Sequence, residues 1–148
     1  MKALLQRVLS GSVTVDGAVV GSIGAGLVVF LGVGRDDEVA DADYLAQKVA
    51  GLRVFQRANA EFDLSVQDID GSVLVVSQFT LMADTRKGRR PSFINAAPPE
   101  KAVVLYERFV AALRTCELTV ATGMFQAYMH VELVNDGPVT VLLDSKRP

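Results

Sequence analysis

The apolar run Leu27-Val28-Val29-Phe30-Leu31 is bounded by glycines, and its length suits a strand that is buried on both faces. Apolar and polar residues alternate over residues 12–15, as they do in a strand with one face toward the core. Asp16-Gly17 then predicts a hairpin turn, and Val19-Val20 continues the returning strand. The N-terminal third of the chain is therefore predicted to consist of strands.

Two helices are predicted farther along the chain. In the first, Asp36 or Asp41 is the expected N-cap, and one face carries the apolar residues Ala42, Leu45, Val49 and Leu52. The second helix begins at Pro98 and Pro99, because proline is tolerated in the first turn. Its apolar stripe is formed by Ala102, Leu105, Tyr106, Phe109 and Leu113.

The other segments alternate with these helices. Residues 70–77 predict a turn followed by a strand, and residues 82–97 predict a long loop with many polar and basic positions. Two strands are expected to close the chain, Met129–Leu133 and Val139–Leu143, joined by a hairpin turn at residues 135–138. This order of strands and helices predicts an α+β fold with a largely antiparallel or mixed β-sheet.

Length and composition limit the class of protein. The chain has 148 residues, of which 50% are hydrophobic, so we expect a single domain over residues 1–148. No apolar run approaches the ~20 residues of a membrane span, and the N-terminus lacks the apolar segment of a signal peptide. Because Cys116 is the one cysteine, no intrachain disulfide can form, and a cytoplasmic location is expected.

Charge and residue types narrow the function. The net charge of −2 argues against a protein that coats nucleic acid through bulk electrostatics, but it allows a local basic patch. One histidine and one cysteine do not supply a conventional zinc site, and no glycine-rich loop joins a strand to a helix. We therefore expect neither a metal ion nor a nucleotide cofactor.

Three segments are candidates for chemistry, and the first is Ser77-Gln78-Phe79-Thr80-Leu81, at the end of an apolar strand. Polar side chains there can face a pocket, and backbone N–H groups that leave the sheet can bind an oxyanion. The plainer interpretation is that Ser77 and Thr80 end the strand and begin a turn. On the residues alone this plainer interpretation is favoured, because hydroxyl side chains are common at strand ends.

The second candidate segment is Asn135-Asp136-Gly137-Pro138-Val139-Thr140. Its Gly-Pro bond is a candidate cis peptide, which would form a rigid corner with main-chain atoms in fixed directions. An ordinary hairpin turn is favoured on composition, because only about 5% of X–Pro bonds in folded proteins are cis.

The third candidate segment is residues 85–93, and its basic tip, which we define as residues 86–90, carries Arg86, Lys87, Arg89 and Arg90. Such a cluster can bind the phosphates of a nucleic-acid end. It can equally be a solvated loop, and the residues alone leave both interpretations open.

Two further residues have reactive side chains, but no neighbouring residue in the sequence would make them catalytic. His130 alternates with Met129 and Val131, so it is expected to point away from their apolar face, at a surface or an interface. Cys116 has no neighbouring histidine or cation, and it is expected to be a small buried side chain rather than a nucleophile.

At these same segments the chain resembles the D-aminoacyl-tRNA deacylases, also called D-tyrosyl-tRNA deacylases. The similarity runs essentially from end to end. Residues 77–81 match one family signature and residues 135–140 match the other. The flanks agree as well, over residues 6–8, 13–17, 26–29 and 87–93.

The resemblance implies a barrel-like homodimer whose active sites lie at the subunit interface and act on the acceptor end of aminoacylated tRNA. It implies that Gly137-Pro138 is cis and enters the pocket of the other subunit as a steric filter. A D-residue or glycine fits beside this corner, whereas the side chain of an L-residue clashes with main-chain atoms. The reaction implied is hydrolysis of the ester of D-aminoacyl-tRNA, a chiral proofreading step in translation.

The resemblance also assigns roles to single residues. The main-chain N–H groups of Phe79 and Thr80 hold the scissile carbonyl, while water attacks with help from the 2′-hydroxyl of the terminal adenosine. Thr80 is not expected to be the nucleophile, because no base is evident to activate it. The other implied site residues are Ser77 and Gln78 in the pocket wall, Met129 beside it, Arg7 bracing the corner, and Arg86, Lys87, Arg89 and Arg90 for tRNA.

One segment departs from the family pattern. Where the family reads Gly-x-Phe-Gly-Ala, this chain has Gly123-Met124-Phe125-Gln126-Ala127, and Tyr128 replaces a small or acidic residue. These changes bear on substrate preference more than on the type of reaction. Two other functions stay open, namely a non-catalytic module that binds an RNA end and a small-molecule esterase that uses Thr80 or Ser77.

Overall fold

A computed structural model of the protein describes residues 1–147, and its two long helices alternate with groups of strands in the predicted order. The strands are β1 (Lys2–Val15), β2 (Ala18–Ile23), β3 (Gly26–Gly32), β4 (Phe55–Arg57), β5 (Ala60–Leu64), β6 (Ser72–Ser77), β7 (Thr119–Thr122) and β8 (His130–Asp144). The helices are α1 (Val39–Gly51), α2 (Pro99–Thr115) and a short 3₁₀ turn, η1 (Phe79–Met82).

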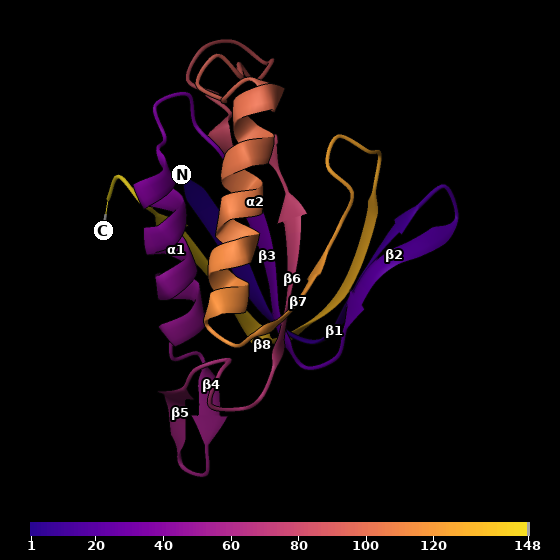
Figure 1. The fold of residues 1–148 in the computed structure, drawn as a ribbon, viewed down its shortest axis with the longest axis vertical. Coiled ribbons are helices and arrows are strands. Elements are labelled where there is room, and N and C mark those ends of the chain that lie inside the picture. Colours follow the sequence, from indigo (N-terminus) through magenta and orange to yellow (C-terminus); the bar gives the residue numbers. More distant parts are fainter. Residues whose placement is uncertain (148) are drawn as a thin grey trace.

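The main sheet is mixed and curls toward closure. Its strand order is β2-β1-β3-β6-β7, and β8 also pairs with β1. The β3–β6 and β6–β7 pairs are parallel, and the other pairs are antiparallel. The outer strands approach each other so closely that a Cβ on Gly21 of β2 would overlap the backbone of Thr122 in β7. The predicted α+β fold with a mixed, barrel-like sheet is confirmed (Figure 1).

The strand β3 is buried on both faces, as its sequence predicts. Leu27, Val29 and Leu31 face the larger core, where the two helices cover one side of the sheet (Figure 1). Val28 faces a second, smaller core on the other side, together with Val8 and Val13 of β1. The burial of every second residue in opposite cores explains why this strand lacks polar positions.

Both helices bury most of the predicted stripes, although Leu52 is the half-buried C-cap of α1 and Ala102 is half-buried in α2. The first helix also begins differently from the expectation. Neither Asp36 nor Asp41 is the N-cap of α1, because Glu38 occupies that position. Asp41 lies in the first turn and accepts a hydrogen bond of 2.8 Å from the backbone N–H of Glu38. The acidic side chain therefore caps the helix from within, in the reciprocal arrangement of a capping box.

The expected hairpin turn at residues 135–138 is wrong. β8 runs as one strand through this region, and both of its halves pair with β1, with Thr140 opposite Gln6 and Asn135 opposite Val8. The residues between Asn135 and Thr140 loop out of the ladder as a bulge. Gly137 has a φ of +126° and Pro138 lacks a backbone N–H, so together they interrupt pairing without reversing the chain.

The hairpin of β4 and β5 was not predicted from the sequence. It extends away from the main sheet below α1 (Figure 1). Its strands are short and largely exposed, so they lack the apolar alternation by which strands are recognised. Within residues 1–147, no helix is long and apolar enough to cross a membrane.

Candidate active site

The first candidate segment lies where β6 ends and the chain leaves the sheet. The backbone N–H of Gln78 makes the last bond to the neighbouring strand, 2.8 Å from the carbonyl oxygen of Leu31. The next N–H to be bonded is that of Leu81, which donates to the carbonyl oxygen of Gln78 at 3.2 Å. Between them, the N–H groups of Phe79 and Thr80 donate to no acceptor within the described residues. Two adjacent backbone donors are therefore free at this strand end.

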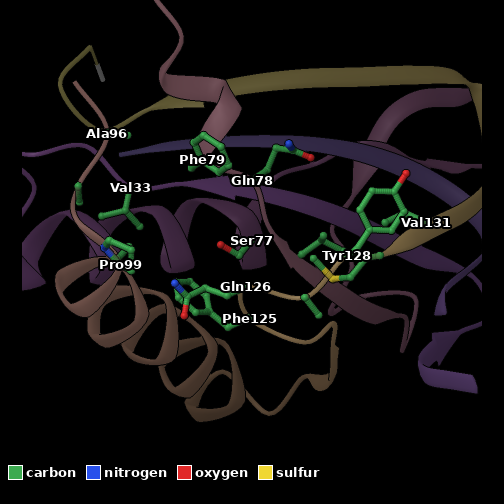
Figure 2. A pocket seen from close by; sticks show the side chains of 15 residues that line it. Val33, Ser77, Gln78, Phe79, Ala96, Pro99, Phe125, Gln126, Tyr128 and Val131 are labelled. Atoms are coloured by element: carbon green, nitrogen blue, oxygen red, sulfur yellow. The ribbon is translucent and has the colours of Figure 1, made fainter. Parts of the chain in front are cut away.

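A cavity of about 560 Å³ opens beside this strand end (Figure 2). Ser77, Gln78 and Phe79 line it, and so does Met129 from the approach to β8. Thr80 is outside the lining, with its hydroxyl hydrogen-bonded to the side-chain amide of Gln78. The remaining lining residues are Val33, Val76, Ala96, Ala97, Pro99, Ala102, Phe125, Gln126, Ala127, Tyr128 and Val131.

The chemistry of the lining is unusual for a hydrolytic pocket. It is mostly apolar, and its polar side chains are the hydroxyls of Ser77 and Tyr128 and the amides of Gln78 and Gln126. Among the described lining residues there is no carboxylate, imidazole, amine or thiol. A reaction in this cavity would rely on hydrogen bonds that hold a carbonyl and a water molecule, rather than on a side-chain acid or base.

The segment that departs from the family pattern forms part of the wall. Phe125, Gln126 and Ala127 all line the cavity, and Gln126 has a φ of +63°. This left-handed conformation is rare for residues other than glycine, which gives a physical reason for the glycine of the family pattern. The departure at Gln126 is visible in the sequence, but Phe125, Ala96 and Pro99 were not predicted as wall residues, because apolar side chains at these positions carry no chemical signal.

The second candidate segment forms an exposed corner in the bulge of β8. The Gly137-Pro138 bond is cis, as the resemblance implies. Nε of Arg7 donates to the carbonyl oxygen of Asp136, 3.1 Å away, and Asn135 donates its side-chain amide to the carbonyl oxygens of Arg7 and Val139 at 2.9 and 3.0 Å. A Cβ on Gly137 would lie 2.9 Å from Cγ2 of Val139 and 3.0 Å from Nη2 of Arg7.

The corner and the cavity do not meet within one chain. Gly137 and Pro138 are exposed, and neither lines the cavity that Ser77 and Met129 share. Arg7 is 6% exposed and bonds to the corner segment, in agreement with the contact expected for it.

The basic tip is exposed, and a backbone bridge between the two flanking segments closes the loop that carries it. Asp84 and Ser92 exchange two backbone hydrogen bonds of 2.8 and 2.9 Å, which close the loop below residues 86–90. Arg86 is ion-paired with Asp84 at 2.6 Å, whereas Lys87, Arg89 and Arg90 make no ion pair within residues 1–147. Next to this bridge, the ring of Phe93 meets Phe79 edge to face with 4.9 Å between centroids, so the loop packs against the strand-end segment.

His130 and Cys116 lie away from the cavity lining. His130 is exposed and packs edge to face against the ring of Tyr128, which agrees with the expected surface position. Cys116 is the C-cap of α2 and is half-buried rather than fully buried. Within residues 1–147, no group of three or more His, Cys, Asp or Glu side chains is placed to hold a metal ion.

Comparison with known proteins identifies the family. The family model described as D-Tyr-tRNA(Tyr) deacylase matches residues 4–144. The chain is 59% identical over 147 residues to a D-aminoacyl-tRNA deacylase of Koribacter versatilis and 57% identical to one of Thermotoga petrophila, with 99% of each chain covered. The chain therefore belongs to the D-Tyr-tRNA(Tyr) deacylase family of enzymes, as the resemblance of its two signatures implies.

Solved structures share the fold. One described as a c-Myc DNA Unwinding Element Binding Protein has a TM-score of 0.91 and 40% sequence identity, covering 97% of this chain and 98% of that one. A second, described as a probable eukaryotic D-amino acid tRNA deacylase, has a TM-score of 0.84 at 16% identity, covering 96% and 97%. At this low identity, the second likeness establishes the fold alone.

Proposed function

We propose that the protein hydrolyses the ester bond of D-aminoacyl-tRNA in the cytoplasm and releases free amino acid and tRNA. The observation that carries this proposal is the pair of free backbone N–H groups on Phe79 and Thr80 beside a cavity without acidic or basic side chains. An aminoacyl ester is already reactive, so positioning and charge stabilisation suffice to cleave it. The deacylase names of the full-length relatives support the same reaction.

In the proposed mechanism, backbone N–H groups stabilise the transition state, and no side chain acts as acid, base or nucleophile. The N–H groups of Phe79 and Thr80 donate to the scissile carbonyl and hold the negative charge that develops on its oxygen. Water attacks this carbon with help from the 2′-hydroxyl of the terminal adenosine. The hydroxyl of Thr80 already accepts a hydrogen bond from Gln78, and no base contacts it within residues 1–147, which argues against a nucleophilic Thr80 or a small-molecule esterase.

The Gly137-Pro138 corner is proposed to be the chiral filter. Main-chain atoms cannot rotate aside as a side chain can, so the side chain of an L-residue would be rejected by an unavoidable clash. Arg7 and Asn135 hold this corner by hydrogen bonds, which favours a fixed shape. Glycine has no side chain to clash, so glycyl-tRNA is proposed to be accepted as well.

A homodimer is proposed to complete the site. The exposed corner lies outside the cavity of its own chain, so it would filter substrates only in the cavity of a second copy. The basic tip is proposed to bind phosphates of the tRNA acceptor end, since three of its cations are without ion-pair partners in the described chain.

The first test is release of amino acid from matched D- and L-aminoacyl-tRNA by the protein in the presence of a metal chelator. Loss of the D-form alone would support both the reaction and the filter. Cleavage of both forms would contradict the filter. Cleavage of neither, with tRNA still bound, would favour the non-catalytic RNA-end binding module instead.

The shared site has its own test by complementation. The side chain added by Gly137→Val would collide with Arg7 and Val139 and should push the corner into the space that the substrate needs, and Ala127→Trp should fill the cavity, so each variant alone should be inactive. If the corner acts in trans, mixing and refolding equal amounts should restore about a quarter of the intact sites, because half the dimers are mixed and each has one intact site. No recovery, with mixed dimers verified by mass, would contradict a corner that acts on the partner subunit.

A further inference from the structure

Gln126 has an unfavourable backbone conformation at a place where its side chain reaches the cavity. Its φ is +63°, and four other non-glycine residues of the described chain also have a positive φ: Asp16, Ala58, Asp70 and Glu117. None of these four lines the cavity, and both aspartates precede a glycine in a turn. A strained position that carries a long polar side chain into a binding cavity points to a role for that side chain.

The amide of Gln126 is free to bind a ligand. Gln126 is exposed, and no hydrogen bond within residues 1–147 involves its side chain. In Figure 2 the amide points toward the side of the cavity that Ala96 and Pro99 form, and away from Tyr128 and Val131. The amide group can present both an N–H donor and its carbonyl acceptor to a ligand that occupies this side of the mainly apolar cavity.

The course of the chain indicates which part of a substrate reaches this side. The loop that carries the basic tip continues directly to Ala96, Ala97 and Pro99, which line the cavity. If the tip binds phosphates, the nucleoside attached to them enters along this wall, and the amino acid lies beyond the ester. The rings of Pro99 and Phe125 give this side flat apolar surface of the kind that supports a base.

We propose that Gln126 is a specificity-determining residue whose side-chain amide reads the edge of the terminal adenine. The amide oxygen accepts from the 6-amino group, and the amide N–H donates to N7, as glutamine does when it recognises adenine in other settings. This inference rests on the proposed function, because it assumes that an aminoacylated tRNA end occupies the cavity.

The test combines changes in the base with changes in the residue. D-aminoacyl-tRNA would be prepared with terminal adenosine, with 7-deazaadenosine, which lacks N7, and with purine riboside, which lacks the 6-amino group. The wild type is expected to lose about fivefold in kcat/KM with either altered base, the effect of one hydrogen bond. Gln126→Met keeps the length and the backbone demand without the amide, and it is expected to treat all three bases alike.

Glu117→Met is the matched control, since Glu117 has a φ of +62° but is exposed at the end of α2. It is expected to retain the base preference of the wild type. Equal losses with altered bases in the wild type and in Gln126→Met would overturn the inference. So would a Gln126→Met defect that depends on the amino acid and not on the base, because the amide would then contact the amino acid.

Binding of adenosine 5′-monophosphate separates this inference from the proposed function. Calorimetry should show that the wild type prefers this nucleotide to purine riboside 5′-monophosphate, and that Gln126→Met has no such preference. This outcome would support the contact even if the wild type failed to hydrolyse any D-aminoacyl-tRNA, which would refute the proposed function. Indifference of the wild type to the two nucleotides would overturn the contact.

Discussion

Arg7 and Asp136 are joined at two points. Nε of Arg7 donates to the carbonyl oxygen of Asp136 at 3.1 Å and lies 3.3 Å from its carboxylate. Nη1 of the same side chain donates to the carbonyl oxygen of Val54 at 2.6 Å. One buried cation therefore ties the bulge of β8 to β1 and to the segment that precedes β4.

Removing this cation should destabilise the protein. Arg7→Met would leave the carbonyl oxygens of Val54 and Asp136 without their donor, so the free energy of unfolding should fall by about 3 kcal/mol. Urea denaturation measures this loss. Arg57→Met is the control, because Arg57 is 67% exposed in its ion pair with Asp63 and should change stability by less than about 0.5 kcal/mol. Equal effects of the two variants would show that the buried cation has no special role.

Gly137→Ala should weaken both stability and D-aminoacyl-tRNA hydrolysis. The new Cβ would meet Val139 and Arg7, and the φ of +126° is unfavourable for alanine. A destabilisation of about 1–3 kcal/mol is expected. Gly24→Ala, where a Cβ meets nothing within 4 Å, should leave both properties close to those of the wild type. A fully active Gly137→Ala variant would argue against a role for the shape of the corner.

Thr80→Ala should retain substantial hydrolysis. Its proposed contribution comes from the backbone N–H, which alanine keeps, and its hydroxyl is already hydrogen-bonded to Gln78. A kcat within about tenfold of the wild type is expected in single-turnover measurements. Near-total loss of the chemical step with substrate binding unchanged would support a nucleophilic threonine.

The basic tip should affect tRNA binding more than chemistry. Arg89→Ala and Arg90→Ala should raise KM and reduce the slope of log affinity against log salt by up to about 1 for each lost phosphate contact. Arg86→Ala should have a smaller effect, because Arg86 is already paired with Asp84. Arg108→Ala, which removes an arginine paired with Asp43 on another surface, is the control and should leave the salt slope unchanged. Unaltered slopes in the tip variants would mean that the tip does not contact phosphates.

Acid should weaken the contacts around Asp41. Burial alone would raise its pKa, but hydrogen bonds from Lys146, Ser145 and the Glu38 backbone outweigh this effect and lower the pKa from 3.8 to about 2. Because the folded pKa is lowered, the stabilisation is complete above pH 3.8 and is lost as pH falls toward about 2. Asp41→Asn should therefore lower the free energy of unfolding by about 1–2 kcal/mol at neutral pH.

The same carboxylate gives a pH-dependent comparison. The stability difference between the wild type and Asp41→Asn, measured by urea denaturation, should shrink as pH falls through this window. Lys146→Met removes the main partner and should reproduce the trend. A difference that stays constant with pH would show that ionisation of Asp41 does not stabilise the fold.

Much of the fold was predictable because its strands and helices carry strong local patterns. The doubly buried strand around Val28, the Asp16-Gly17 turn and the Pro99 helix start all depend on neighbours in sequence. The bulge of β8 was not predictable, because glycine and proline indicate an interruption of pairing but not whether the chain then reverses. Pairing with β1 decides that question, and it depends on residues more than a hundred positions away.

The site was predictable only in part, for a similar reason. The implied site residues Ser77 and Met129 do line one cavity, but Pro99 and Phe125 join them from segments that are distant in the sequence. The resemblance implied that the corner enters the pocket of the other subunit, and the corner does lie outside the cavity of its own chain. No local sequence pattern distinguishes an apolar residue of the cavity wall from an apolar residue of the hydrophobic core.

β8 carries two parts of the proposed machinery on one continuous strand. Val131 near its start forms cavity wall beside Met129, which directly precedes the strand, and Gly137 and Pro138 in its middle form the corner, while β1 pairs with both halves of the strand. Fraying of this strand would damage the catalytic wall and the selecting element together. A copy damaged by heat or mutation would then lose its activity. It would not become an unselective hydrolase that cleaves correctly charged L-aminoacyl-tRNA.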